Sequence, residues 1–157
     1  MHDGSEQVVG IIFPSVPVPA GVVVNDAYVL FDVDEVRPGA SDADVTISIY
    51  GEKNTNAAMP SNTRFDLSSR TPTAAAVSWQ PEPSANVHDE LKTPDLSPIV
   101  NEIINLQGWA EGNPMGILFG HVAGGGSRWV VRRHVVASVA LRSHTRRVRA
   151  GSLPHQQ

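Results

Sequence analysis

Hydrophobic and polar residues alternate along two segments of the chain. Residues 27–34 place Phe31 and Val33 on the same side of an extended chain, and residues 45–50 repeat the pattern with a valine and two isoleucines. A two-residue period is typical of a β-strand with one buried face, because successive side chains of a strand point to opposite sides. Both segments are therefore predicted to be half-buried strands of an antiparallel sheet.

One further stretch has the longer period of a helix. Residues 96–106 carry apolar side chains at a spacing of three and four residues, which makes one apolar helix face. Asp95 or Ser97 can cap its first turn, and Gly108 follows where a helix-ending glycine is expected. Short apolar runs between turn residues predict more strands, at residues 8–13, 75–79 and 115–119.

Many short strands, 12 prolines, 13 glycines and a single helix predict an all-β fold. We expect an antiparallel β-sandwich or jelly roll with one short α-helix at about residues 96–106. A chain of 157 residues is long enough for one domain with a sizeable core. The core is predicted from the apolar members of the periodic segments, which are Phe31, Val33, Ile47, Ile49, Ile99, Ile103 and Ile104.

The charged residues divide the chain at Glu111. Residues 1–111 hold all 16 acidic residues and five basic ones, a net charge of −11. Residues 112–157 hold the other seven basic residues, all arginine, and carry +7. We therefore expect two parts, an incomplete β-sandwich module over residues 1–129 and a basic tail over residues 130–157.

Several classes of protein are excluded by what the sequence lacks. It has no cysteine, so it forms no disulfide, thiolate metal site or catalytic thiol. No apolar run approaches the roughly 18 residues of a membrane span. The first four residues lack the basic and apolar regions of a signal peptide. If the larger protein to which this module belongs is exported, its signal peptide is expected outside this chain.

Short motifs follow one another in the order typical of one family: VVGIIF at 8–13, VPAG at 18–21, AYVLF at 27–31, DE at 34–35, IYGE at 49–52, NAA at 56–58, SSRT at 68–71, VSW at 77–79, TPDLS at 93–97 and GW at 108–109. As an ordered series over about residues 4–120, they resemble a jelly-roll-like β-sandwich module of secreted multidomain bacterial proteins, of the DNRLRE-like or carbohydrate-binding type. The resemblance implies an extracellular, non-catalytic module.

The chain departs from that family at both ends. Family members have further strand sequence before the point matched by Met1, and they close with a string similar to ESYDG…APLLHVEY. Codons can be chosen for Val130–Val136 that give Ser-Tyr-Asp-Gly-Thr-Ser when they are read one nucleotide later. Codons for Arg142–Arg149 give Ala-Pro-Thr-Leu-Val-Glu-Tyr in the same shifted frame. We therefore expect a module truncated at its N-terminus and frameshifted after about residue 125, with Ala137–Gln157 poorly packed.

Three aromatic residues are candidates for a sugar-binding platform. Trp79, Trp109 and Tyr50 can offer flat apolar faces with polar edges, which suit the rings of a polysaccharide. The alternative is that they fill the core, because large aromatic side chains are mostly buried.

A second candidate site is acidic. Asp32, Asp34 and Glu35, together with Asp42 or Asp44, can supply the oxygen ligands that Ca²⁺ prefers. Their spacing matches no EF-hand loop, so the alternative is a solvated acidic loop. No other cofactor is expected.

Catalysis and nucleic-acid binding have less support. The six histidines show no metal-ligand spacing, and no Gly-x-Ser-x-Gly elbow accompanies the serines, so a hydrolase is a distant alternative. Residues 124–128 are rich in glycine but lack the Lys-Ser/Thr pair of a phosphate loop. The arginines of the tail support only non-specific attraction to nucleic acid.

Two hypotheses of function follow. The first is a secreted, non-catalytic module that attaches a larger protein to polysaccharide or to a cell surface. The second is a truncated, frameshifted relic with no evolved activity of its own. The nucleotide sequence separates them, because only the second requires family strings in a shifted frame.

Overall fold

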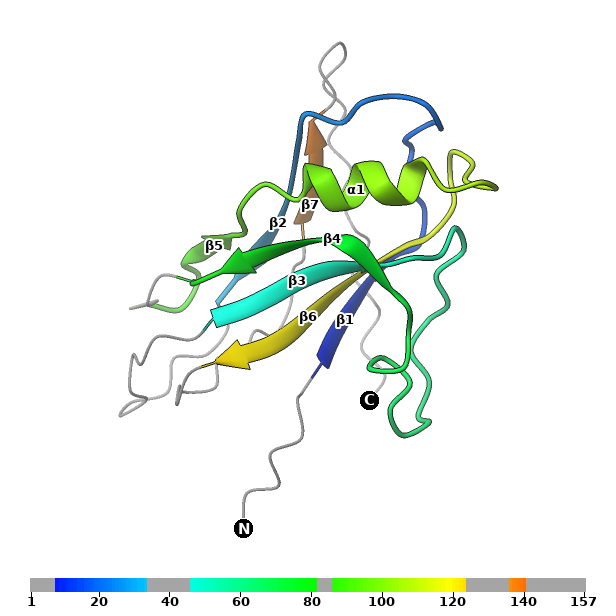
Figure 1. Cartoon of the computed structure of the whole chain (residues 1–157). Coiled ribbons are helices and arrows are strands. Elements are labelled where there is room, and N and C mark those ends of the chain that lie inside the picture. Colours follow the sequence, from blue (N-terminus) through cyan, green and yellow to red (C-terminus); the bar gives the residue numbers. More distant parts are fainter. Residues whose placement is uncertain (1–7, 34–45, 82–85, 124–135, 141–157) are drawn as a thin grey trace, which may run out of the picture.

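The structure, a computed structural model, describes residues 8–33, 46–81, 86–123 and 136–140. Its strands form two antiparallel sheets (Figure 1). One is four-stranded, in the order β1 (Val8–Phe13), β6 (Met115–Ala123), β3 (Thr46–Glu52) and β4 (Pro72–Trp79). The other is three-stranded, in the order β5 (Glu90–Lys92), β2 (Asp26–Asp32) and β7 (Val136–Ala140). The predicted class, an all-β sandwich with one short helix, is confirmed.

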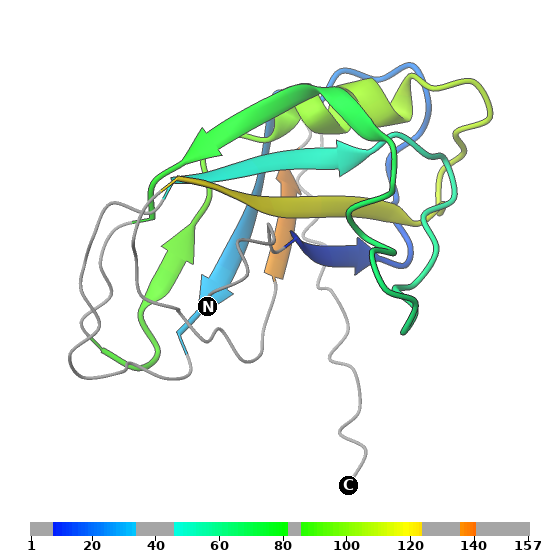
Figure 2. The same cartoon turned by 60° about the horizontal axis from the view of Figure 1, so that its bottom comes forward.

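The helix α1 (Ser97–Ile104) closes one end of the sandwich. It contacts β3 and β4 of the four-stranded sheet and β2 of the three-stranded sheet, and Figure 2 shows it lying behind β4. Gly51 on β3 allows this close approach, because a Cβ there would lie 2.6 Å from Ile103 Cδ1 and 2.8 Å from Ile99 Cγ2. The helix can therefore lay its apolar face directly on the sheet.

The helix is shorter than predicted at both ends. Leu96 stands at the N-cap, and Pro98 occupies the first turn, where its missing N–H costs nothing. Asp95 supports this end from outside, because its carboxylate accepts the N–H of Ser97 at 2.9 Å. Gly108 does not end the helix as predicted. The C-cap is Asn105, and Gly108 lies in a further turn with φ +95°.

Most of the predicted core is confirmed. Ile49, Ile99, Ile103 and Ile104 are fully buried, and Val33 is 2% exposed. Phe31 and Ile47 are only partly buried, which corrects the prediction. They lie next to the ends of β2 and β3, at the end of the sandwich opposite α1. Alternation along a strand indicates which face of the sheet a side chain points to. It does not indicate where along the strand the opposing sheet ceases to bury that face.

Two strands were not predicted as such, and both lie in the three-stranded sheet. β5 has three residues, too few to show a period. β7 lies inside the segment that the sequence assigned to the tail, and it pairs antiparallel with β2 from Ala140 opposite Asp26 to Val136 opposite Leu30. The last four of these residues belong to the segment Ala137–Gln157, for which poor packing was expected, and here they pair with β2. The rest of the tail is outside the described residues, so the domain boundary and the frameshift stay predictions.

Candidate ligand-binding loop

The aromatic residues predicted as a platform do not meet on one surface. Trp79 is 9% exposed and its ring stacks on Phe31, with the centroids 5.7 Å apart. Trp109 is 6% exposed and donates its indole N–H to the carbonyl of Val18 at 2.9 Å. Both tryptophans are core residues, which was the alternative interpretation. Tyr50 is half-buried on the opposite, outer face of the four-stranded sheet, with its ring beside Gly120.

The acidic candidate site is only partly within the described residues. Asp32 ends β2, and its carboxylate lies 3.3 Å from Nδ1 of His88. Asp34 and Glu35, like Asp42 and Asp44, fall outside the described ranges. In the ranges that are described, no three His, Asp or Glu side chains are arranged to hold a metal ion. The calcium site stays a prediction.

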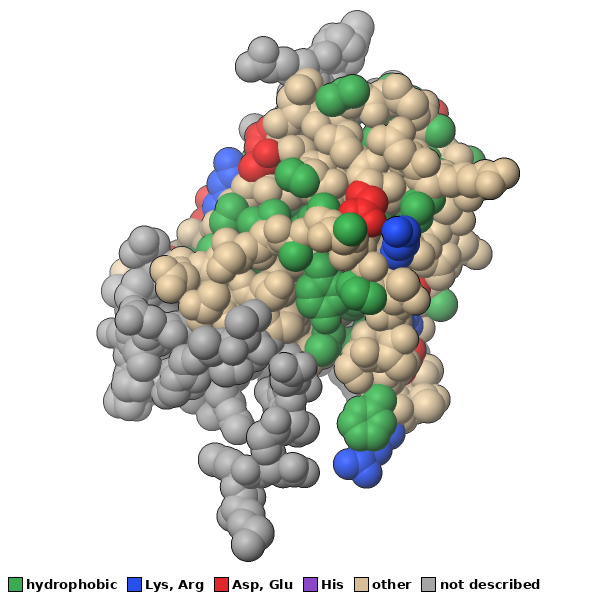
Figure 3. All heavy atoms as spheres, in the orientation of Figure 1, with side chains coloured by type: hydrophobic (Ala, Val, Ile, Leu, Met, Phe, Trp, Pro, Cys, Tyr) green, Lys and Arg blue, Asp and Glu red, His purple; other side chains and the backbone are tan. Residues whose placement is uncertain are grey.

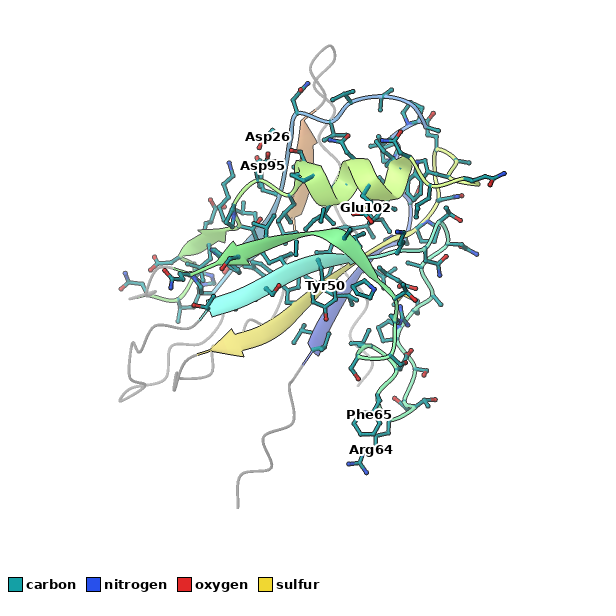
Figure 4. All side chains as sticks on the ribbon, in the orientation of Figure 1. Asp26, Tyr50, Arg64, Phe65, Asp95 and Glu102 are labelled. Atoms are coloured by element: carbon teal, nitrogen blue, oxygen red, sulfur yellow. The ribbon has the colours of Figure 1, made fainter. Side chains whose placement is uncertain are left out.

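A different feature stands out at the loop between β3 and β4, residues 53–71, which we call the β3–β4 loop. Its tip carries Phe65, which is 63% exposed and has a backbone φ of +66°. The Arg64 guanidinium carbon lies 4.8 Å from the centre of the Phe65 ring. Figure 4 shows both side chains projecting from the body of the protein, and Figure 3 shows a hydrophobic group beside a basic one at this place.

The conformation of Phe65 is unusual for a bulky residue. A positive φ brings Cβ close to the backbone, so non-glycine residues rarely adopt it. Holding such a residue there costs on the order of 1–3 kcal/mol. Isolated apolar side chains on a surface are common and need no explanation. Of the two non-glycine residues with a positive φ in the described ranges, Phe65 and His88, only Phe65 is a large apolar residue, and this marks the tip as the candidate site.

The base of the β3–β4 loop is fixed by an ion-pair network. The guanidinium of Arg70 donates to Glu52 Oε2 at 2.8 Å and to the carbonyl of Ala58 at 2.8 Å. It also lies 3.3 Å from both carboxylate oxygens of Asp66. Only 9% of the Arg70 side chain and 8% of the Glu52 side chain are exposed. Asn54 donates to the other oxygen of Glu52 at 3.0 Å, so the buried carboxylate has a partner at each oxygen.

The charges of the network reinforce one another. Burial works against the charge of Arg70, but the hydrogen bonds and negative charges of Glu52 and Asp66 outweigh it and raise the pKa of Arg70. The N–H of Ser61 donates to Asp66 at 2.6 Å and, with Arg70, lowers the pKa of that carboxyl. Arg70 and Asp66 are therefore both charged at neutral pH.

Apolar contacts seat the loop on the outer face of the sheet. Leu67 lies over Gly10 of β1, where an added Cβ would be 2.8 Å from Leu67 Cδ2 and 3.1 Å from Leu118 Cδ2. The loop is thus held on the sheet by the apolar contact of Leu67 and by the ion pairs of Arg70, and its tip at Phe65 projects from the protein.

A second carboxylate network joins α1 to β4. Glu102 on α1 accepts the N–H groups of Ala74 at 2.9 Å and Ala75 at 2.8 Å, and Lys53 Nζ lies 3.6 Å from it. The bonds from Ala75 and Ala74, and then the charge of Lys53, hold the pKa of Glu102 below its ordinary value. Glu102 therefore ties the helix to an edge strand and covers two of the strand's free donors.

We expect the stabilisation from Glu102 to disappear in acid. A carboxyl whose pKa is lowered by folding stabilises the protein above its unfolded value of 4.5, and the effect is lost as the pH falls through the lower folded value. Glu102→Gln should therefore be less stable than the parent protein at pH 7, and the difference should shrink below about pH 4.5. Urea unfolding across this pH range measures it. A difference that does not change with pH would contradict the assignment.

Sequence reasoning missed the β3–β4 loop as a site. The motifs IYGE and SSRT contain Glu52 and Arg70, but nothing in either motif indicates that they meet across 18 residues. The positive φ of Phe65 leaves no local sequence signal either, because glycine or asparagine would be expected there.

Comparison of the chain with protein-family models, with curated proteins and with solved structures finds no match in any of the three. The family resemblance therefore stays a prediction. Among the described residues, no helix is long and apolar enough to cross a membrane.

Proposed function

We propose that this protein is a non-catalytic, extracellular binding module that attaches a larger secreted protein to polysaccharide or to a cell surface. The observation that supports it is the exposed ring of Phe65, held in a strained backbone conformation at the tip of the β3–β4 loop. The β-sandwich fold and the family resemblance agree with this role.

An exposed aromatic ring with a polar neighbour suits a sugar. The C–H face of a pyranose can stack on the apolar face of Phe65, and the hydroxyl groups of the sugar remain free for polar partners. Arg64 lies over the Phe65 ring, and its N–H groups offer donors next to a sugar that stacks on the other face. Strain at a binding residue is expected when the surrounding structure holds that residue in place for its partner.

Phe65→Ala should therefore weaken binding to an insoluble polysaccharide by about tenfold or more, because truncation of a central aromatic contact typically has such an effect. A pull-down with cellulose, chitin, xylan and peptidoglycan measures the bound fraction. Val23→Ala is the matched control, because Val23 is 71% exposed in the segment between β1 and β2. If the parent protein binds one of these polymers and Phe65→Ala binds it equally well, the tip is not the site.

A second candidate is the frameshifted relic without evolved activity. The charge division favours it, because a segment with seven basic and no acidic residues follows one with a net charge of −11. The gene decides between the two. A reading frame shifted near residue 125 is expected to encode Ser-Tyr-Asp-Gly followed by a terminal Val-Glu-Tyr. Stop codons in that frame, or the absence of these strings, would remove the relic hypothesis.

A further inference from the structure

Arg70 joins three parts of the β3–β4 loop. It binds Glu52 at the end of β3, the carbonyl of Ala58 at 2.8 Å where the loop leaves the sheet, and Asp66 at 3.3 Å beside the tip. Met59 adds a longer carbonyl contact at 3.5 Å. A guanidinium group suits this role because its donors form a rigid planar fork. The three segments are therefore fixed relative to one another by one side chain.

This network does more than seat the loop. Leu67 already holds the β3–β4 loop against Gly10 of β1 by apolar contact. A buried ion pair is in general no more stabilising than apolar residues of similar volume, since both charges lose their hydration. A network that apolar residues could replace without loss of stability can serve another role, and the geometry at Asp66 points to one.

Asp66 follows Phe65 directly and is held at several atoms. Its N–H donates to the carbonyl of Thr63 at 3.2 Å, and one carboxylate oxygen accepts the N–H of Ser61 at 2.6 Å. The carbonyl of Phe65 itself accepts the N–H of Ser69 at 2.9 Å. With Arg70 holding the carboxylate, the peptide on the C-terminal side of Phe65 has little freedom. The direction of the Cα–Cβ bond of Phe65 follows from it.

We infer that Arg70 is a positioning residue: through Asp66 and Glu52 it holds Phe65 in its exposed, left-handed conformation, so that the ring is already in place when a polysaccharide arrives. The inference rests on the proposed function. A preformed ring binds more tightly because no entropy is lost in ordering the loop on contact. Substitution of Arg70 is then expected to weaken polysaccharide binding even when the β-sandwich remains folded.

The test removes the network without leaving a charge buried. In the double variant Arg70→Met with Glu52→Gln, both buried charges are lost, and the shape of residue 52 is kept beside Gly116. Hydrogen exchange of the backbone amides from residue 61 to residue 69 reports the order of the tip. We expect exchange there to accelerate by about tenfold or more, with β2, β3 and β6 unchanged. Lys53→Gln, which breaks an exposed ion pair to Glu102, is the control and should change neither region.

Binding to cellulose, chitin, xylan and peptidoglycan completes the test. The double variant should lose about as much binding as Phe65→Ala, and Arg70→Lys should fall between it and the parent protein because lysine keeps the positive charge but not the planar fork of donors. Slow exchange at residues 61–69 in the double variant would overturn the inference, whatever happens to binding. If Phe65→Ala keeps full binding, the proposed function fails instead, and the exchange data still decide whether Arg70 orders the tip.

Discussion

Ile103→Ala is expected to lower the free energy of unfolding by about 2–5 kcal/mol, because it removes three buried carbons and leaves a cavity. Ile103 is fully buried in α1, and its Cδ1 fills the space that the missing Cβ of Gly51 leaves on β3. The site lies where the helix meets the sheet, so the surroundings can collapse only if the helix moves. A large cost is therefore expected.

Urea unfolding of three variants checks this assignment. Ile47→Ala should cost less than Ile103→Ala, because Ile47 is only partly buried. Val23→Ala, at a position 71% exposed, should change stability by no more than about 0.5 kcal/mol. Equal effects at Ile103 and Val23 would show that α1 does not pack on β3 as described.

Arg70→Met as a single substitution is expected to destabilise the protein by about 3–5 kcal/mol, because it leaves the carboxylate of Glu52 buried without its cation. Glu52 is 8% exposed, and Asn54 remains as a neutral partner for one oxygen. We therefore expect a value near the lower end of this range.

A double-mutant cycle isolates the interaction. Adding Glu52→Gln to Arg70→Met removes the buried charge, and most of the lost stability should return. Thermal or urea unfolding of the parent protein, both single variants and the double variant gives the coupling energy. If the effects of the two substitutions simply add, the two side chains do not form the buried pair described here.

The β-strands and the helix could largely be predicted from local patterns. The alternation in residues 27–34 identified the inward face with Val33, and the alternation in residues 45–50 did so with Ile49. The helical period identified Ile99, Ile103 and Ile104 as buried. These patterns are reliable because side-chain direction follows from the backbone geometry of each element, which is a local property. The ends of the elements were less accurate, because they depend on contacts such as that of Asp95 with Ser97.

The candidate site could not be predicted in this way. The types of Trp79 and Trp109 suit either a platform or a core, and only the opposing sheet and the segment around Val18 place them in the core. Phe65 belongs to a polar stretch that predicts an ordinary loop. Its exposure and its positive φ leave no local signal, and the neighbouring Asp66 pairs with Arg70, which binds Glu52 at the end of β3.

The sequence by itself determined the all-β class, the position of the single helix, the inward faces of β2 and β3 and the division of charge at Glu111. Only the tertiary structure decided the order of the strands, the pairing of β7 with β2, the buried pair of Arg70 and Glu52 and the projecting ring of Phe65. The physical reason is the range of the interactions. Periodicity reflects dihedral angles that repeat along the chain, whereas strand order and buried ion pairs depend on which distant segments come together when the chain closes on its core.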